Sequence, residues 1–276
     1  MIQFTELDFL ETQNLVRRFA FQKKMFSNYF MNDLKGMMSF HTDGTLLLKK
    51  NYVNFCRIYF ISDNKSELIK LFSELNNTDA INIPTKKDID EDMLEILKAG
   101  GYKSLTVYER LYKNTNEARG EFEESFAKPE DVDTIMSLLL EQLFNPISDR
   151  IPSREEILDS IYKKQVLVNR DTEDNVNGVL IFSIEGKKCN FLEWASTASA
   201  GESLFLFYNA FNLMNEKGIE RSTIWVRSDN LRPKKIYQSW GYQPDGLKDY
   251  TFVKYANNNV ITVKRCDDSI SRHKFS

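Results

Sequence analysis

The alternation of apolar and polar positions predicts a chain that mixes helices and strands. Apolar side chains between Phe9 and Leu34 recur at three- and four-residue spacing, which predicts that most of the first forty residues are helical. Runs rich in β-branched and aromatic residues then predict strands at 45–49 and 53–62. The same patterns predict a helix over 66–75, a strand over 80–83, a helix over 88–99 and a strand over 105–112.

A polar, apolar-poor stretch at 114–124 (NTNEARGEFEE) is the best candidate for a linker. It divides the chain into an N-terminal domain over residues 1–115 and a C-terminal domain over residues 120–276. The second part predicts the order β-α-α-β-β-β-α-β-α-β-β. Its elements are a short strand at 124–127, helices from 128 to 143 and from 153, strands at 166–170, 176–185 and 188–195, a helix ending near 218, a strand at 222–227, a helix at 232–240, and strands at 250–255 and 260–263.

The two parts contain a weak internal repeat, which we call the internal echo. Residues 80–112 and 222–255 both run strand, polar turn, helix, Gly-Tyr and strand, and aligning Gly101-Tyr102 with Gly241-Tyr242 superimposes their helices. We therefore expect two halves that descend from one ancestral unit.

Composition narrows the class of protein. The chain has 276 residues, 42% hydrophobic and 28% charged, with a formal net charge of −3. This charge balance argues against a nucleic-acid partner, because proteins that bind nucleic acids usually have a basic surface. No apolar run reaches the roughly 18 residues of a membrane span, and the N-terminus lacks a signal-peptide pattern. We expect a cytoplasmic protein without a membrane partner.

Rare residues exclude several kinds of site. The three cysteines are far apart in the sequence and form no CxxC pair, which argues against a disulfide framework or a zinc ribbon. Only two histidines are present, so a histidine-based nucleophilic centre would have to use His41 or His273. Chemistry based on carboxylates, tyrosine, backbone amides or a thiol cofactor is favoured.

The segment IWVRSDNLRPKKIYQSWGY resembles the late signature of the GCN5-related N-acetyltransferase superfamily, through Asn230, Pro233, Tyr237 and Gly241-Tyr242. The resemblance implies an α+β fold of two acetyltransferase-like halves, each a mixed, mostly antiparallel twisted sheet flanked by helices. The N-terminal half would be degenerate. It also implies acetyl-CoA as the acyl donor, no metal, a small-molecule or peptide amine as the acceptor, and a possible homodimer.

The resemblance places the cofactor along the stretch EWASTASAGESLFLFYNAF, which begins at Glu193. In the family, acyl-CoA lies along a splayed strand, and its pyrophosphate binds backbone N–H groups in the turn that follows. Carried onto this chain, the cofactor-binding residues are Trp194, Ala195, Ser196, Ser199, Ala200, Gly201 and Glu202, with Asn230 and Arg232 on the later helix. Ser199 stands where the family has a glycine. Alternatively, Ser199 and Glu202 form an S-x-x-E capping box, which needs no ligand.

Acyl transfer to an amine requires a base for the ammonium proton and an acid for the leaving thiolate. The resemblance makes Tyr237 the candidate acid, although its ring alternatively only packs. Glu193 interrupts an apolar run, so a raised pKa would suit it as the base, with Glu185 in reserve because the strand register is open. The loop where the family binds its acceptor contains Asp149, Arg150 and Glu155 in this chain. These residues could bind a charged acceptor, or they could be charged only because the loop is exposed to solvent.

These features predict an acyl-CoA-dependent N-acyltransferase, with the C-terminal half carrying the activity. The alternatives are a catalytically silent acetyltransferase-like binding protein and an acyltransferase that uses an aminoacyl-tRNA donor. The N-terminal half is expected to lack a cofactor site of its own, because only the residues DNK separate its strand at 53–62 from the next helix.

Overall fold

A computed structural model describes residues 2–22, 25–29, 36–75, 79–114, 120–142, 145 and 147–254. The α-helices of these residues are α1 (Phe9–Gln22), α2 (Lys65–Glu74), α3 (Glu91–Ala99), α4 (Val132–Glu141), α5 (Arg154–Tyr162), α6 (Ala200–Glu216) and α7 (Leu231–Ser239). The strands are β1 (Thr5–Glu6), β2 (Phe26–Ser27), β3 (Met37–His41), β4 (Thr45–Asn51), β5 (Cys56–Ser62), β6 (Asp79–Thr85), β7 (Lys103–Asn114), β8 (Val166–Arg170), β9 (Val176–Glu185), β10 (Lys188–Ser196), β11 (Arg221–Arg227) and β12 (Gln243–Val253).

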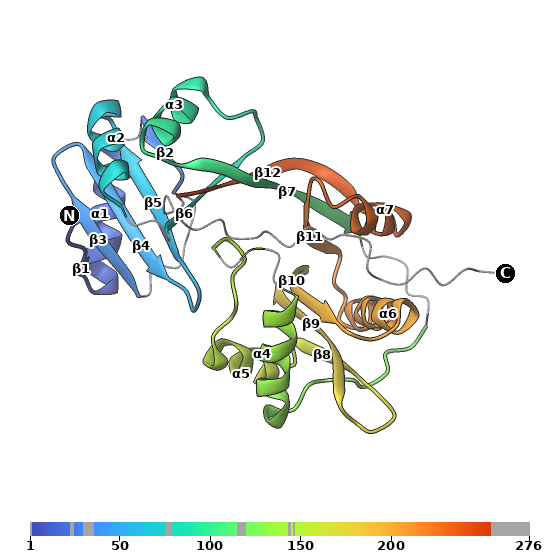
Figure 1. Ribbon diagram of the computed structural model, residues 1–276. Coiled ribbons are helices and arrows are strands. Elements are labelled where there is room, and N and C mark those ends of the chain that lie inside the picture. The colour runs from blue at the N-terminus through green and yellow to red at the C-terminus, as the bar shows by residue number, and fades with distance from the viewer. Residues whose placement is uncertain are drawn as a thin grey trace.

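All of these strands belong to one sheet. Its order is β1-β3-β4-β5-β6-β12-β7-β11-β10-β9-β8, and β2 pairs with β5 outside this path. Neighbouring strands are antiparallel except for two parallel pairs, β5 with β6 and β10 with β11. Strands β1 to β6 therefore occupy one end of the sheet and β8 to β11 the other, with β12 and β7 between them, as Figure 1 shows. The fold is a mixed α+β fold.

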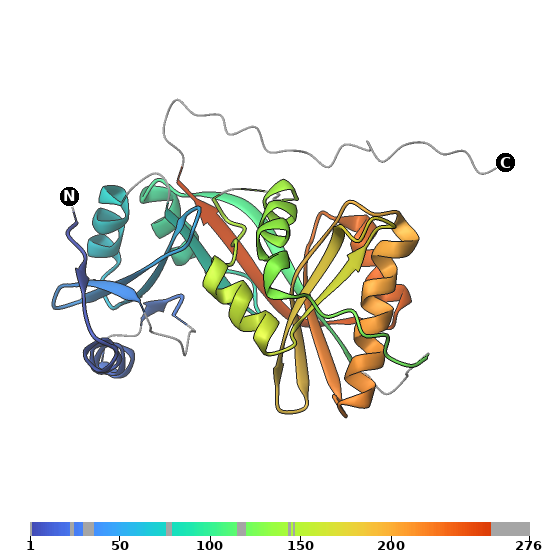
Figure 2. The same cartoon turned by 90° about the horizontal axis from the view of Figure 1, so that it is seen from below.

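Two long strands join the ends of the sheet. The C-terminal strand β12 lies between β6 and β7, and β7 lies between β12 and β11. Within the β7–β12 pair, Glu109 is opposite Lys248 and Tyr108 is opposite Asp249. In Figure 2, β12, drawn in red, crosses the middle of the molecule between the N-terminal strands and the strands of the other end. Neither end can form its complete sheet without a strand from the other.

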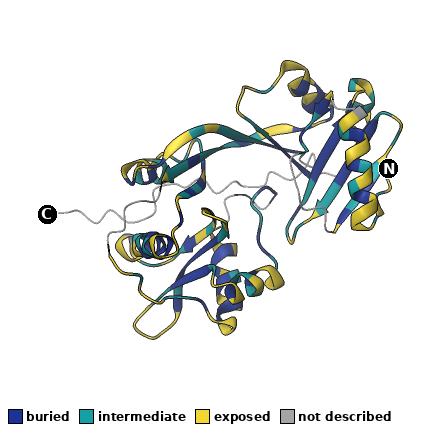
Figure 3. Cartoon of the chain, turned by 180° about the vertical axis from the view of Figure 1, so that it is seen from behind, coloured by how far each residue is buried: buried dark blue, intermediate teal, exposed yellow. Residues whose placement is uncertain are grey.

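Helices cover both faces of the sheet, because successive side chains of a strand point to opposite faces. At the N-terminal end, Leu47 and Phe60 pack in the core that includes α2 and α3, while Leu46 and Tyr59 pack on the face of α1. At the other end, α6 and α7 cover one face and α4 and α5 the other. Figure 3 shows buried strands between helices whose outer surfaces are exposed.

The two parallel pairs are hydrogen-bonded over only a short length. At the N-terminal end, pairing covers residues 56–58 of β5 and 79–81 of β6. Beyond this point the side chain of Asn28 lies between the strands. Its amide donates to the carbonyls of Ile58 (3.0 Å) and Asn82 (3.0 Å), and its carbonyl accepts from the N–H of Phe60 (2.7 Å).

The structure confirms most predicted elements and corrects others. The long N-terminal helix was wrong beyond Gln22, because Phe26 instead pairs with Ser62 as part of β2 and packs in the core. Strand β3 was missed, and β12 begins at Gln243 rather than at 250. The predicted short strand at 124–127 is a single bridge between Phe126 and Leu167. The predicted strand at 260–263 lies outside the described residues.

We predict that Asn28→Ala lowers the free energy of unfolding by about 2–4 kcal/mol, because it removes three hydrogen bonds and leaves buried backbone groups without partners. Asn14→Ala is the matched control, since Asn14 lies on an exposed face of α1. Chemical denaturation measures both. A loss below about 1 kcal/mol in Asn28→Ala would show that this side chain does not hold the strands together.

Candidate active site

The strand before the predicted cofactor turn separates from its neighbour, as expected. β10 pairs with β11 only where residues 188–190 meet 221–223, whereas β10 pairs with β9 along its whole length. The register to β9 shifts between Phe191 and Glu193, where Leu192 forms a bulge. Among the described residues, no strand continues the pairing along Phe191–Ser196 on the side of β11. We call this backbone the free edge of β10.

At the N-terminal end of the sheet, the edge of β5 beyond its pairing with β6 is occupied by the chain itself. There the diverging strands hold the side chain of Asn28, and β2 pairs with β5, with Phe26 opposite Ser62 and Ser27 opposite Ile61. The chain itself thus occupies the edge of β5 that corresponds to the free edge of β10. A ligand could bind along β5 only by displacing this segment.

Glu193 lies half-buried on the free edge. Burial raises the pKa of its carboxyl to about 8, while Arg150 nearby lowers the pKa and Asp149 raises it. Much of this carboxyl is therefore protonated at neutral pH, and its pKa lies close to the range that a general base needs. Glu185 is exposed at the other end of the β9–β10 hairpin, opposite Lys188.

The loop that contains Asp149 and Arg150, which we call the acceptor loop, comes close to Glu193. The structure therefore brings these three side chains together. The carboxylate of Asp149 accepts from the hydroxyl of Tyr108 (2.6 Å) and from the N–H of Asn145 (2.9 Å). Arg150 forms an ion pair with Glu156. Asp149 is thereby fixed to β7, a strand of the N-terminal half.

This loop docks on the N-terminal half through several contacts. Ile147 packs in a buried cluster with Phe55, Ala80 and Val253. The side-chain amide of Asn54 donates to the carbonyl of Asp149 (2.8 Å). Figure 1 shows the segment between α4 and α5 extending toward this end of the sheet. Both halves therefore contribute to the surroundings of Glu193.

The turn before α6 is a helix cap. The N–H of Ser199 donates to the Glu202 carboxylate (3.0 Å), and the N–H of Glu202 approaches Ser199 Oγ (3.4 Å), which confirms the predicted capping box. Ser196 Oγ accepts from the N–H of Ala198 (3.2 Å). The first N–H groups of a helix have no acceptor within the helix. Within the described part of the chain, the N–H of Gly201 has no hydrogen-bond acceptor. A donor at the helix start can face an anion.

The other predicted cofactor residues surround the same strand and helix. Trp194 is 37% exposed and its ring contacts Phe207 of α6, while the side chain of Ala195 is buried on the opposite face among α4 and α5. Asn230 precedes α7 and makes no side-chain cap, and Arg232 is exposed. The structure does not bring Arg232 into contact with Glu193 or with the acceptor loop.

Tyr237 is buried in the core between α6 and α7. Its ring packs against Phe207, Trp240 and Tyr242. Burial raises the pKa of the phenol, so the hydroxyl stays protonated at neutral pH. Among the described residues, no hydrogen bond ties down this hydroxyl.

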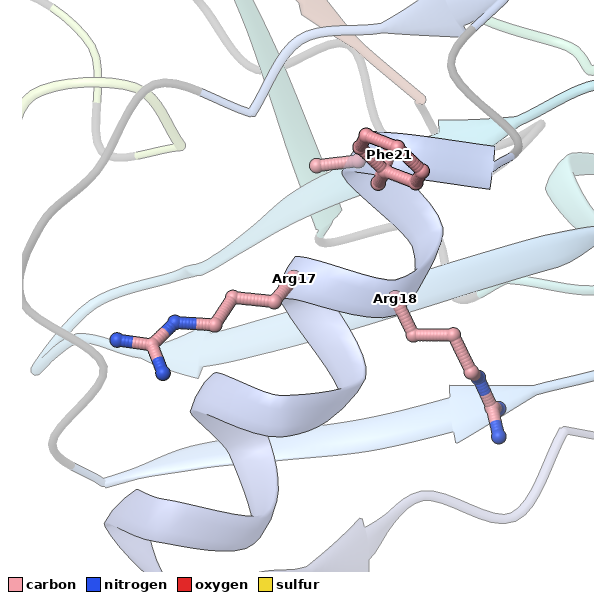
Figure 4. A pocket seen from close by; sticks show the side chains of 4 residues that line it. Arg17, Arg18 and Phe21 are labelled. Atoms are coloured by element: carbon pink, nitrogen blue, oxygen red, sulfur yellow. The ribbon is translucent and has the colours of Figure 1, made fainter.

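Two hollows lie outside this arrangement. One, of about 660 Å³, lies beside the start of α6 and includes Glu202 and Phe205, but no residue of β10 lines it. The other, of about 700 Å³, lies on α1 beside Arg17, Arg18 and Phe21, whose side chains Figure 4 shows projecting from the helix. The second hollow contains none of the predicted site residues.

Sequence reasoning missed the contribution of the N-terminal half. Tyr52, Arg57 and Tyr108 lie beside the acceptor loop, yet their spacing carries no motif. An arginine among aromatic residues in the strand VNFCRIYF was the available signal. In the described residues, no helix is long and apolar enough to cross a membrane. No group of three or more His, Cys, Asp or Glu in that part of the chain is arranged to hold a metal.

Comparison with known proteins finds similarity in structure but not in sequence. No protein-family model and no curated protein matches the chain. A GCN5-related N-acetyltransferase from Sphaerobacter thermophilus aligns over 76% of each chain, with a TM-score of 0.56 and 12% identity. An acetyltransferase of the same family from Colwellia psychrerythraea aligns over 93% of this chain and 100% of its own, with a TM-score of 0.52 and 11% identity.

The chain has the GCN5-related N-acetyltransferase fold. A third similar structure is the N-myristoyltransferase of Saccharomyces cerevisiae with bound myristoyl-CoA. It aligns over 92% of this chain and 78% of its own, with a TM-score of 0.50 and 10% identity. At such identities the likeness establishes the fold, and the chemistry has to be argued from the residues of this chain.

The raised pKa of Glu193 predicts a pH-dependent stability. The unfolded carboxyl loses its proton near the ordinary value of 4.5, while the folded carboxyl keeps it up to about 8. The folded state binds the additional proton, so this contribution to stability is present at low pH and is lost as the pH rises toward 8. Relative to Glu193→Gln, the wild type should lose at most about 1.4 kcal/mol per pH unit between pH 5 and 8.

Chemical denaturation across this pH range measures the effect. Glu185→Gln is the control, because Glu185 is exposed, and its stability should differ from that of the wild type by a constant amount. A constant difference between the wild type and Glu193→Gln would contradict the raised pKa.

Proposed function

We propose that the protein is an acyl-CoA-dependent N-acyltransferase, most simply one that transfers acetyl from acetyl-CoA to a primary amine. The observation that carries this proposal is the free edge of β10, which has a half-buried carboxyl on it and leads to the start of α6, where the N–H of Gly201 has no acceptor among the described residues. The fold supports it, because the compared proteins include acetyltransferases and a transferase with bound myristoyl-CoA.

Glu193 acts as the base in this proposal. Its carboxylate takes a proton from the acceptor ammonium, and the amine nitrogen then attacks the thioester carbonyl. The new C–N bond forms as the C–S bond breaks, and the thiolate leaves with the sulfur electron pair. Tyr237 supplies the proton that converts this thiolate to the free thiol. The amide nitrogen loses its second proton to solvent, and solvent returns a proton to the Tyr237 phenolate. Asp149 and Arg150 adjust the charge around Glu193 and hold the acceptor.

Acyl-CoA would lie along Trp194 and Ala195, using the exposed backbone of the free edge. Its pyrophosphate would meet the N–H groups of Ala200 and Gly201, with Ser196 and Ser199 as hydroxyl neighbours. Asn230 and Arg232 would lie toward the nucleotide part. The carboxylate of Glu202 opposes an anion at this helix start, so binding would require the capping box to open.

We further infer that the two ends of the sheet are copies of one acetyltransferase-like unit and that only the C-terminal copy binds cofactor. Both copies have a parallel strand pair that diverges, followed by a helix, but the N-terminal pair holds Asn28. In this arrangement residues 1–115 and 120–276 are not separate sheets, because β7 and β12 are shared.

A catalytically silent binding protein of the same fold is the second candidate. The capping box favours it, because Ser199 and Glu202 already satisfy two N–H groups of the turn without a ligand. Titration with acetyl-CoA, followed by measurement of thiol release with a panel of amines, separates the candidates. Binding without release supports the silent protein, and the absence of binding at millimolar ligand contradicts both.

Two substitutions in the turn test its role in cofactor binding. Gly201→Ala places a methyl group where no protein atom lies within 4 Å, so stability should be unchanged or higher by up to about 1 kcal/mol. CoA affinity should fall several-fold, because the methyl group obstructs the pyrophosphate. Ser199→Gly should cost only a few tenths of a kcal/mol and tighten CoA binding. Calorimetric titration measures both, and unchanged affinity in both variants would show that the turn is only a cap.

Tyr237→Phe tests the proposed acid. Turnover should fall at least tenfold, equivalent to about 1.4 kcal/mol of transition-state stabilisation. Thermal stability should change little, since the ring contacts remain and no hydrogen bond of the hydroxyl to the described residues is lost. Steady-state kinetics with acetyl-CoA provide the measurement. Unchanged turnover would assign Tyr237 a packing role alone.

A further inference from the structure

The ring of Tyr52 contacts two guanidinium groups that come from opposite halves of the chain. The guanidinium carbon of Arg57, on β5, is 5.2 Å from the ring centre. The corresponding carbon of Arg150, in the acceptor loop, is 5.3 Å from the same centre. The charge of Arg150 also reaches Glu193, where it lowers the pKa. Arg150 therefore lies near the proposed base, and Arg57 contacts the other side of the same loop through Ser148 and shares the Tyr52 ring with Arg150.

The two arginines and the acceptor loop carry buried hydrogen-bond donors that have no acceptor among the described residues. The Nε atoms of Arg57 and Arg150 are buried and have no hydrogen-bond partner among the described residues. The same is true of the side-chain nitrogen of Asn145, a residue with 0% exposure. Other atoms of Arg57 do have partners, since its guanidinium donates to the carbonyl of Ser148 (3.4 Å) and hydrogen-bonds the side chain of Tyr59. Buried donors of this kind are costly unless an acceptor meets them.

A buried carboxylate near Arg57 has a hydrogen-bond acceptor without a partner, in contrast to these donors. Asp249 of β12 accepts from Asn82 through Oδ2 (2.8 Å), while its Oδ1 is buried without a hydrogen-bond partner in the described residues. Burial raises the pKa of Asp249 to about 6, although the charge of Arg57 lowers it. The junction of the two halves thus offers unsatisfied donors on two arginines and an unsatisfied acceptor on a carboxylate.

We propose that the acceptor is a small amine that also carries an anionic group, and that Arg57 and Arg150 bind this group while its amine faces Glu193. The proposal rests on the N-acyltransferase function proposed above and names the class of its acceptor. The planar donor fork of arginine matches a carboxylate or a phosphate, and an ion pair with either satisfies the buried Nε atoms. A neutral analogue leaves the same donors unpaired, which makes the site selective.

The test uses matched acceptors that differ in one charge. Each α-amino acid is compared with its own amide, and O-phosphoethanolamine is compared with ethanolamine. Thiol release from acetyl-CoA and the thermal shift of the protein are measured for every pair. We expect at least one anionic member to be preferred at least tenfold over its neutral partner in kcat/KM. The amino-acid and phosphate arms identify which anion the arginines bind.

Arg57→Gln should reduce this preference to less than about threefold, mainly by raising KM for the anionic acceptor, and should leave acetyl-CoA affinity unchanged. Arg154→Gln is the matched control, because Arg154 is an exposed arginine paired with Asp133 on the surface, and it should keep the wild-type preference. Circular dichroism establishes that both variants are folded.

The outcomes separate this proposal from the proposed function. If acetyl-CoA binds but no anionic acceptor exceeds its neutral partner in turnover or thermal shift, the acceptor class is wrong and the function stands. The acceptor class is also wrong if Arg57→Gln weakens both members of a pair equally. If acetyl-CoA does not bind, an Arg57-dependent thermal shift with the anionic members alone still supports the anion site without the acyl transfer.

Discussion

The pairing of β7 with β12 is the interaction on which the rest of the structure depends. Each of these strands is hydrogen-bonded to the other and to a further strand at one end of the sheet, β12 to β6 and β7 to β11. This arrangement converts two sets of strands into one sheet and fixes their relative position. It also places Tyr108 opposite Asp249 at the middle of the molecule, where Tyr108 holds the acceptor loop through Asp149. The surroundings of Glu193 follow from this pairing.

A second constraint is the divergence of the two parallel strand pairs. A strand whose neighbour departs exposes backbone groups that need partners. At the N-terminal end the chain meets this need itself, with Asn28 bridging Ile58, Phe60 and Asn82. Along the free edge of β10, the described residues provide no corresponding partner. The divergence is thus closed by the chain at one end and left open at the other, and this difference is the physical basis of the proposed single cofactor site.

Local features of the structure could be predicted from the sequence, whereas contacts between residues far apart in the chain could not. Ser199 and Glu202 predicted their capping box because both partners lie within one helical turn. The raised pKa of Glu193 followed from a carboxyl within an apolar strand. By contrast, the role of Asn28 depends on strands that follow it by thirty and more residues, and no local spacing encodes such a contact.

The sharing of strands between the halves was hidden for the same reason. The linker at 114–124 predicted a division into residues 1–115 and 120–276, but it carried no sign that β12 returns to pair with β6. The internal echo at Gly101-Tyr102 and Gly241-Tyr242 predicted related elements but not that their final strands lie side by side. Tyr52 and Arg57 could not be assigned to the site, because only tertiary structure brings the acceptor loop onto them.

A crystal structure of the protein with CoA tests the central claim most directly. We expect one molecule of CoA per chain, with its pantetheine along Phe191–Ser196 and its pyrophosphate at the start of α6. Asn28 should remain between β5 and β6. A CoA molecule along β5 with Asn28 displaced, or a second molecule per chain, would contradict it.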